Sequence, residues 1–134
     1  MKGELFAVAA VAALSGCSAM GGGRRLSRSA ELPAAEGTVR FVKTGVDETF
    51  IDLRVKHLED PNRLSAPAYT YVAWVSGTRD DPPRNVGALS LGRDCSGALR
   101  TAIPLRRFEI FVTAESTSDA AAPTGERLLW TARD

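Results

Sequence analysis

The thiol and imidazole groups of this sequence are few, and they limit the chemistry that it can perform. Its two cysteines are Cys17 and Cys95, and its one histidine is His57. A zinc site needs several Cys, His or carboxylate ligands at close spacing, and no such Cys/His spacing occurs here. A hydrolytic site needs a nucleophile, a base and an orienting carboxylate, and no pattern nominates that set. We therefore expect no catalytic residues, no metal and no cofactor.

The segment before Cys17 has the composition of a secretory leader. A short polar start that includes Lys2 is followed by an unbroken apolar run of ten residues, Leu5–Leu14. Ten helical residues extend about 15 Å, which is half of the ~30 Å hydrocarbon core of a bilayer. This length is typical of the hydrophobic region of a signal peptide and is too short for an ordinary membrane span.

The four residues Leu14-Ser15-Gly16-Cys17 resemble the lipobox of bacterial lipoproteins. The resemblance implies diacylglycerol on the Cys17 thiol, cleavage before Cys17 and acylation of the new amino terminus. Such acyl chains anchor a protein firmly, because each buried CH₂ contributes about 0.8 kcal/mol. The alternative is an ordinary signal peptide in which Cys17 is incidental. The residue after Cys17 is Ser18 and not aspartate. By resemblance to the lipoprotein sorting rule of enteric bacteria, this residue favours the outer membrane over the inner membrane.

The chain divides into three expected parts: a signal peptide over 1–16, a lipidated cysteine and flexible tether over 17–35, and a folded domain over 36–134. The tether is inferred from the run Gly21-Gly22-Gly23 and from the lack of a periodic apolar pattern. Arg24, Arg25 and Arg28 form a basic cluster in it. This cluster either contacts anionic headgroups or is a solvated part of the linker, and both interpretations stay open.

Residues 36–134 have the pattern of β-structure throughout. Ile51, Leu53 and Val55 alternate with polar residues, as in a half-buried strand, and Ala68–Ser76 is apolar on both faces, as in a central strand. Further strands are expected at Val39–Phe41, Val86–Leu91, Ala98–Ile103, Phe108–Ala114 and Arg127–Ala132. About seven short strands separated by Gly- and Pro-containing turns predict a single all-β domain, an immunoglobulin-like antiparallel β-sandwich.

The charge balance bears on the class of partner. The whole chain has a net charge of +1, and residues 36–134 hold thirteen Lys or Arg against fourteen Asp or Glu, a net of −1. Neutralising phosphates needs a clear basic excess, so nucleic acid is not an expected partner.

Four short motifs in the second half of the chain are Tyr71-Val72-Ala73-Trp74-Val75, Val86-Gly87-Ala88-Leu89, Phe108-Glu109-Ile110-Phe111-Val112-Thr113-Ala114-Glu115 and Pro123-Thr124-Gly125. Their order resembles the extracytoplasmic C-terminal domain of anti-sigma-K-type factors. The resemblance implies the fold and an extracytoplasmic setting. Those factors bind their sigma factor through a cytoplasmic helical domain joined by a transmembrane helix, and neither pattern occurs here. Sigma binding is therefore not carried over.

The residues of these motifs have structural roles as their simplest explanation. Phe108, Ile110 and Val112 are expected on one face of a core strand, with Trp74 as their packing partner. Glu115, at the strand end, is expected to cap a turn or to pair with an arginine. Tyr69 and Tyr71 share one strand face and Trp74 takes the other, so the three do not form a single aromatic platform.

The remaining candidates are a thiol, an imidazole and two acidic pairs. Cys95 is left unpaired once Cys17 is acylated, which permits an intermolecular disulfide, a reactive thiol or, as we expect, a quiet free thiol. His57 is in phase with the apolar residues before it, so we expect it to point toward the core. The pairs Glu59-Asp60 and Asp80-Asp81 precede prolines, which favours turn chemistry over calcium binding.

These observations predict a lipoprotein of the cell envelope, anchored to membrane lipid through Cys17, whose β-sandwich is a non-catalytic binding or structural module with an envelope protein as its partner. The alternative is an extracytoplasmic sensory or regulatory module related to anti-sigma factors. An envelope enzyme is the third possibility, and no set of residues supports it.

Overall fold

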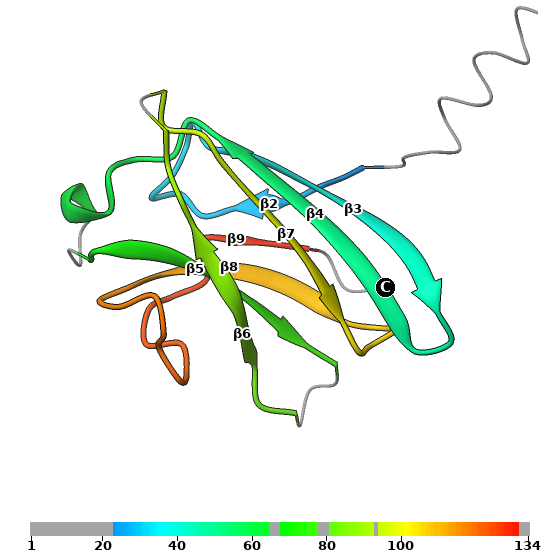
Figure 1. Ribbon diagram of the computed structural model, residues 1–134. Helices are drawn as coiled ribbons and strands as arrows, with labels where there is room; N and C mark the ends of the chain where they lie inside the picture. The colour runs from blue at the N-terminus through cyan, green and yellow to red at the C-terminus, as the bar shows by residue number, and fades with distance from the viewer. Residues whose placement is uncertain (1–22, 65–67, 78–80, 93, 132–134) are drawn as a thin grey trace, which may run out of the picture.

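The computed structural model describes residues 23–64, 68–77, 81–92 and 94–131, which form two antiparallel β-sheets packed face to face (Figure 1). The elements in chain order are β1 (Arg24–Arg25), β2 (Ser27–Arg28), β3 (Glu36–Gly45), β4 (Glu48–Lys56), the 3₁₀ turn η1 (Pro61–Arg63), β5 (Thr70–Ser76), β6 (Arg84–Leu89), β7 (Gly97–Ile103), β8 (Glu109–Glu115) and β9 (Leu129–Trp130). The predicted all-β sandwich is confirmed.

The first sheet, sheet A, has the strand order β1-β3-β4-β7, and the second, sheet B, has the order β2-β9-β8-β5-β6. Consecutive hairpins build much of each sheet, with β3 paired to β4 in one and β5 paired to β6 in the other. In the ABED sheet of immunoglobulin constant domains the second strand, B, lies beside strand E. In sheet A the second strand, β3, lies instead beside its immediate successor β4. The sandwich architecture is therefore shared, with a different connection inside sheet A.

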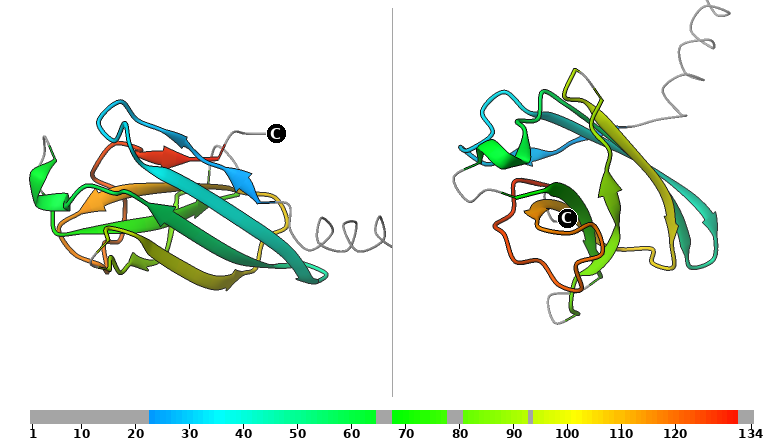
Figure 2. Two further views of the ribbon diagram at one scale, coloured as in Figure 1. Left: turned by 90° about the horizontal axis from the view of Figure 1, so that it is seen from above. Right: turned by 60° about the vertical axis from the view of Figure 1, so that its left-hand side comes forward.

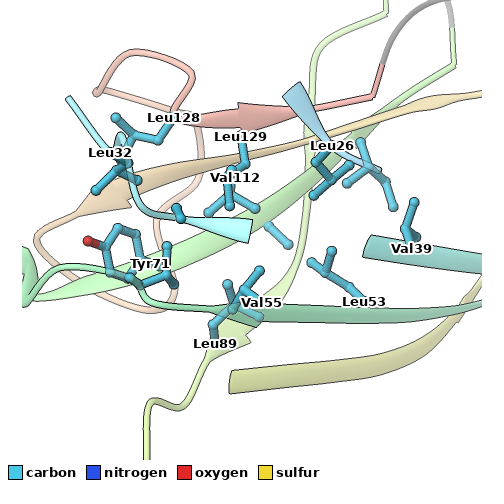
Figure 3. Close-up of a cluster of buried hydrophobic side chains, with 14 of the residues drawn as sticks. Leu26, Leu32, Val39, Leu53, Val55, Tyr71, Leu89, Val112, Leu128 and Leu129 are labelled. Carbon is cyan, nitrogen blue, oxygen red and sulfur yellow. The ribbon is translucent and has the colours of Figure 1, made fainter. Parts of the chain in front are cut away.

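The main core lies between the two sheets and is built by alternation along the strands. In β4 the buried side chains of Ile51, Leu53 and Val55 are at most 1% exposed, and the residues between them face solvent. Figure 3 shows Leu53 and Val55 pointing toward Tyr71 and Val112 of sheet B. The strand predicted from the Ile-Leu-Val spacing is thus confirmed, and its buried face meets the opposite sheet.

Strand β5 is buried on both faces, as its unbroken apolar pattern predicts, and its outer face holds a second cluster. Val72 and Trp74 pack there with Phe111 of β8, and all three are at most 2% exposed. The segment between β8 and β9 covers this face: Ala120 packs on the cluster, and Asn85 of β6 donates to the carbonyl oxygen of Ala120 at 3.0 Å. The turned view in Figure 2 shows this segment curling beside β5 and β6.

The expected partners of Trp74 are therefore wrong. Ile110 and Val112 point into the main core between the sheets, whereas Trp74 lies on the opposite face of sheet B, paired in register with Phe111. The prediction of these packing partners failed because both faces of β5 are apolar. Alternation separates Trp74 from Tyr71, but it does not say which of the two faces meets the other sheet.

The expected flexible tether over 17–35 is also wrong for residues 23–35, while 17–22 lie outside the described residues. β1 pairs with β3 and β2 pairs with β9, so this segment crosses from the edge of sheet A to the edge of sheet B. Leu26 and Leu32 are buried in the main core (Figure 3), and Ala35 is buried in the same core. Leu26 packs so closely on Gly37 that a Cβ there would approach its Cδ1 to 2.8 Å.

Replacing Leu32 by alanine is expected to lower the free energy of unfolding by about 2–3 kcal/mol, because Leu32 is 2% exposed and its removal leaves a cavity. A tether residue would show no effect. Urea unfolding followed by circular dichroism measures the change. Val46→Ala, at a side chain 80% exposed, is the control and should stay within about 0.5 kcal/mol of the parent.

The two ends of the sandwich differ in what they carry. One end, which we call the hairpin end, holds the turn between β3 and β4 and the segment between β7 and β8, on the right in Figure 1. Thr49 of β4 donates its hydroxyl to the carbonyl oxygen of Leu105 at 2.8 Å, which ties that segment to the hairpin. The opposite end, which we call the η1 end, holds η1, His57 and Cys95.

Candidate functional site

The structure places His57 differently from its predicted position. Cys17 lies outside the described residues. His57 is exposed and has a left-handed backbone with φ of 57°, so it does not point into the core as expected. β4 ends at Lys56, and the left-handed turn at His57 breaks the two-residue alternation. The next residue, Leu58, takes the buried position at 2% exposure.

Cys95 lies beside His57 at the η1 end, because the backbone N–H of Leu58 donates to the carbonyl oxygen of Cys95 at 3.0 Å. Its thiol is free and exposed, and its backbone is also left-handed, with φ of 60°. In the described part of the chain no hydrogen bond joins this thiol to the imidazole. The neighbouring Asp94 carboxylate accepts from the hydroxyl and backbone N–H of Ser96, which lowers the pKa of Asp94. The geometry is that of a hydrogen-bonded turn with a surface thiol.

The acidic pairs perform turn chemistry where the structure describes them. Asp60 caps η1 by accepting from the backbone N–H of Asn62 at 3.0 Å. Glu59 lies 3.9 Å from the guanidinium of Arg63 across the same turn. Asp80 lies outside the described residues, and the backbone carbonyl of Asp81 accepts from the Ser76 hydroxyl at 3.3 Å.

As predicted, the two tyrosines and Trp74 do not form a single aromatic surface. Tyr71 is fully buried in the main core and donates its hydroxyl to the carbonyl oxygen of Glu59, whereas Tyr69, just before β5, is 76% exposed. Burial, together with the charges of Glu59 and Asp60, raises the pKa of Tyr71. Trp74 lies on the other face of sheet B. Tyr71 thus anchors the η1 segment, and Tyr69 alone is presented to solvent.

Among the described residues, Glu115 is a buried carboxylate that accepts several hydrogen bonds. It is 2% exposed and accepts from the hydroxyl of Thr113 at 2.5 Å, from the hydroxyl of Thr124 at 2.6 Å and from the backbone N–H of Gly125 at 3.4 Å. Trp74 Nε1 donates to the same Thr113 hydroxyl at 2.9 Å. The predicted capping of a turn by Glu115 is confirmed: the Pro-Thr-Gly turn is held to the end of β8 by this carboxylate. We call this set the Glu115 network.

The Glu115 network gives the sandwich a pH dependence on the acid side. Burial raises the pKa of Glu115, but the hydrogen bonds from Thr113, Thr124 and Gly125 outweigh it, so the pKa lies below its ordinary value of 4.5. A lowered folded-state pKa means that the stabilisation is present above pH 4.5 and is lost as the pH falls through the folded-state value.

The free energy of unfolding is therefore expected to decrease on acidification below pH 4.5. Urea titrations across this range measure the slope. In Glu115→Gln, which cannot ionise at this position, the acid slope should be shallower than in the parent. An identical slope in both proteins would assign the acid sensitivity to other carboxylates.

The outer face of sheet A carries a group of charges that sequence reasoning missed. Register places Arg40, Asp52 and Arg100 in one row across β3, β4 and β7. Asp52 lies 3.7 Å from the guanidinium of Arg100 and 3.3 Å from that of Arg54. The alternation of β4 predicts that Asp52 and Arg54 face solvent, but the register that brings Arg40 and Arg100 beside them is a tertiary property.

No family model, no curated protein and no solved structure was found to match this chain. In the described ranges, no helix is long and apolar enough to cross a membrane. Those ranges also contain no group of three or more His, Cys, Asp or Glu that could hold a metal ion. Residues from three of the four short motifs of the second half of the chain meet in the Glu115 network, and Val86–Leu89 lies outside it.

Proposed function

We propose that this chain is a lipid-anchored protein of the cell envelope whose β-sandwich is displayed as a non-catalytic binding or structural module. The observation that carries the proposal is the Leu14-Ser15-Gly16-Cys17 motif, followed after only five residues by the first described residue of the sandwich, Gly23. In this order the lipidated residue would stand shortly before the folded domain in the sequence.

The distribution of polar groups in the sandwich supports a module without catalysis. The Glu115 carboxylate is satisfied by hydrogen bonds from its own fold, and the Asp60 and Asp94 carboxylates cap turns. The imidazole and the thiol lie at exposed turns without a hydrogen bond between them in the described chain. A general base needs a nucleophile within hydrogen-bond reach, and the described chain shows no hydrogen bond between the His57 imidazole and the Cys95 thiol.

Mass spectrometry of the mature protein tests the anchor. We expect a polypeptide that begins at Cys17 and carries three acyl chains, together with recovery of the protein in the membrane fraction. Cys17→Ser should remove the acyl mass completely, whereas Cys95→Ser, which removes the other thiol, should leave it unchanged. A mature terminus elsewhere, or an unmodified Cys17 thiol, contradicts the proposal.

Crosslinking in intact cells, followed by capture of the acylated protein, tests the module. One crosslinked envelope protein at fixed stoichiometry supports a binding or structural role. Capture of a transmembrane component of an anti-sigma system supports the regulatory alternative instead, because that alternative requires a partner that reaches the cytoplasm.

A further inference from the structure

The place where the chain enters the sandwich defines which end lies toward the anchor. β1 runs antiparallel to β3, with Arg24 opposite Val39, so Gly23 lies beside Arg40. A Cβ on Gly23 would be 3.8 Å from Cγ of Arg40. From this point β3 continues to the turn of the β3–β4 hairpin (Figure 2). The residues of β3 after Val39 are half-buried or exposed. β1 therefore meets β3 at its middle, and the N-terminal end of β1 points toward the hairpin end.

The length of chain before Gly23 limits the distance between the sandwich and an acylated Cys17. Six residue steps separate Cys17 from Gly23, and six separate Arg40 from Val46 at the hairpin turn. Six steps span at most about 20 Å in any conformation. β3 is extended from Arg40 to Gly45, so the hairpin turn projects beyond the level of Gly23 by a length comparable with a fully extended tether. An anchor at Cys17 holds this end of the sandwich next to the bilayer.

The hairpin end exposes apolar side chains that the sandwich does not cover. Val46 is 80% exposed and Val42 is 49% exposed. Register puts Val42 in one row with Phe50 and Ala102 on the outer face of sheet A, where Phe50 is half-buried and Ala102 is exposed. These residues form an apolar edge nearest to the hairpin turn.

Cations border this apolar edge. The exposed basic residues at the hairpin end and in the next row of sheet A are Arg40, Lys43, Arg100, Arg106 and Arg107. The acidic residues among them are Asp47, Glu48 and Asp52 on sheet A and Asp81 beside the β7–β8 segment. Glu48 accepts from Thr44, and Asp52 lies between two arginines. The excess is cationic, and apolar side chains backed by Arg and Lys are the arrangement that suits the headgroup region of a membrane.

We propose that the hairpin end docks on the bilayer surface, with Val46 and Val42 in the headgroup region and the surrounding arginines on anionic phospholipid headgroups. This inference rests on the proposed lipid anchor, which supplies proximity, while the hairpin end supplies orientation. In this orientation the η1 end, with the exposed Tyr69, faces away from the membrane and is the end open to a partner.

A fluorophore at each end of the sandwich tests the orientation in the full acylated protein. In a Cys95→Ser background, Val46→Cys places an environment-sensitive label at the hairpin turn, and Tyr69→Cys places it at the η1 end. The two positions are matched, at 80% and 76% exposure. The proteins are reconstituted into vesicles of phosphatidylethanolamine and phosphatidylglycerol that contain nitroxide-labelled lipid.

We expect a blue-shifted emission and strong nitroxide quenching for the label at position 46, with a water-like emission at position 69. Replacing phosphatidylglycerol by phosphatidylcholine should reduce the quenching at position 46. Equal quenching at the two positions overturns the proposed orientation. Quenching at position 46 that does not change when phosphatidylglycerol is replaced overturns the role of the cations. Mass and flotation of the same samples report the anchor separately: non-acylated protein that does not float refutes the proposed anchor, whereas floating protein with an unquenched hairpin refutes only the docking.

Discussion

Replacing Glu115 by alanine is expected to lower the free energy of unfolding by about 3–5 kcal/mol, one of the two largest effects of a single change in this chain. The carboxylate accepts from the hydroxyls of Thr113 and Thr124 and from the backbone N–H groups of Thr124 and Gly125. Alanine leaves these donors without their acceptor at a position that is 2% exposed. Urea unfolding at neutral pH measures the change.

Two variants separate the network from charge and from size. Glu115→Gln keeps the shape and one acceptor oxygen, so it should cost less, about 1–2 kcal/mol. Glu126→Ala removes a carboxylate from an exposed position in the same segment and should stay within about 0.5 kcal/mol of the parent. A Glu115→Ala protein as stable as Glu126→Ala would show that the hydrogen bonds of the network contribute nothing net.

Trp74→Ala is expected to cost a similar amount, about 3–5 kcal/mol, because it empties the cluster on the outer face of sheet B. Trp74 is fully buried, and it contacts Val72 and Phe111 beneath the segment between β8 and β9. The guanidinium of Arg127 lies 4.1 Å from the centre of the Phe111 ring, which adds a cation–π contact to the same region. Thermal and urea unfolding measure the loss.

The conservative variant distinguishes packing from hydrogen bonding at this site. Trp74→Phe retains most of the apolar surface but removes the Nε1–H that donates to Thr113, so a smaller loss of about 1–2 kcal/mol is expected. Tyr69→Ala is the aromatic control, since that side chain is 76% exposed. If Trp74→Ala unfolds at the same urea concentration as Tyr69→Ala, the outer cluster is not part of the cooperative core.

Much of the fold follows from local pattern, because burial repeats with the period of a strand. The Ile51-Leu53-Val55 alternation and the segment that is apolar on both faces lie in β4 and β5, as predicted. Residues 23–35 were missed because β1 and β2 have two residues each and gain their structure from pairing with β3 and β9. Their Gly, Arg and Ser composition is typical of a linker, and Leu26 and Leu32 follow no period.

The site-level predictions were limited by geometry that no local pattern carries. The alternation that served for Val55 does not extend to His57, because the backbone turns left-handed there. Turn capping by Glu115 could be predicted from its place between a strand and a Pro-Thr-Gly sequence, but the link from Trp74 through Thr113 requires the register of β5 on β8. The row of Arg40, Asp52 and Arg100 likewise requires three strands in register.

The antiparallel pairing of β1 with β3 also determines how the sandwich bears mechanical load. A pull on the chain at Gly23 acts along the axis of β1, and the hydrogen bonds to β3 are perpendicular to that axis. The bonds are thus loaded in shear and resist together, where a peeling geometry would break them one after another. Behind β1, Leu26 is lodged in the core and β2 is paired with β9 of the other sheet. Tension at the N-terminus is shared between both sheets, which suits a domain held to its surroundings at that end.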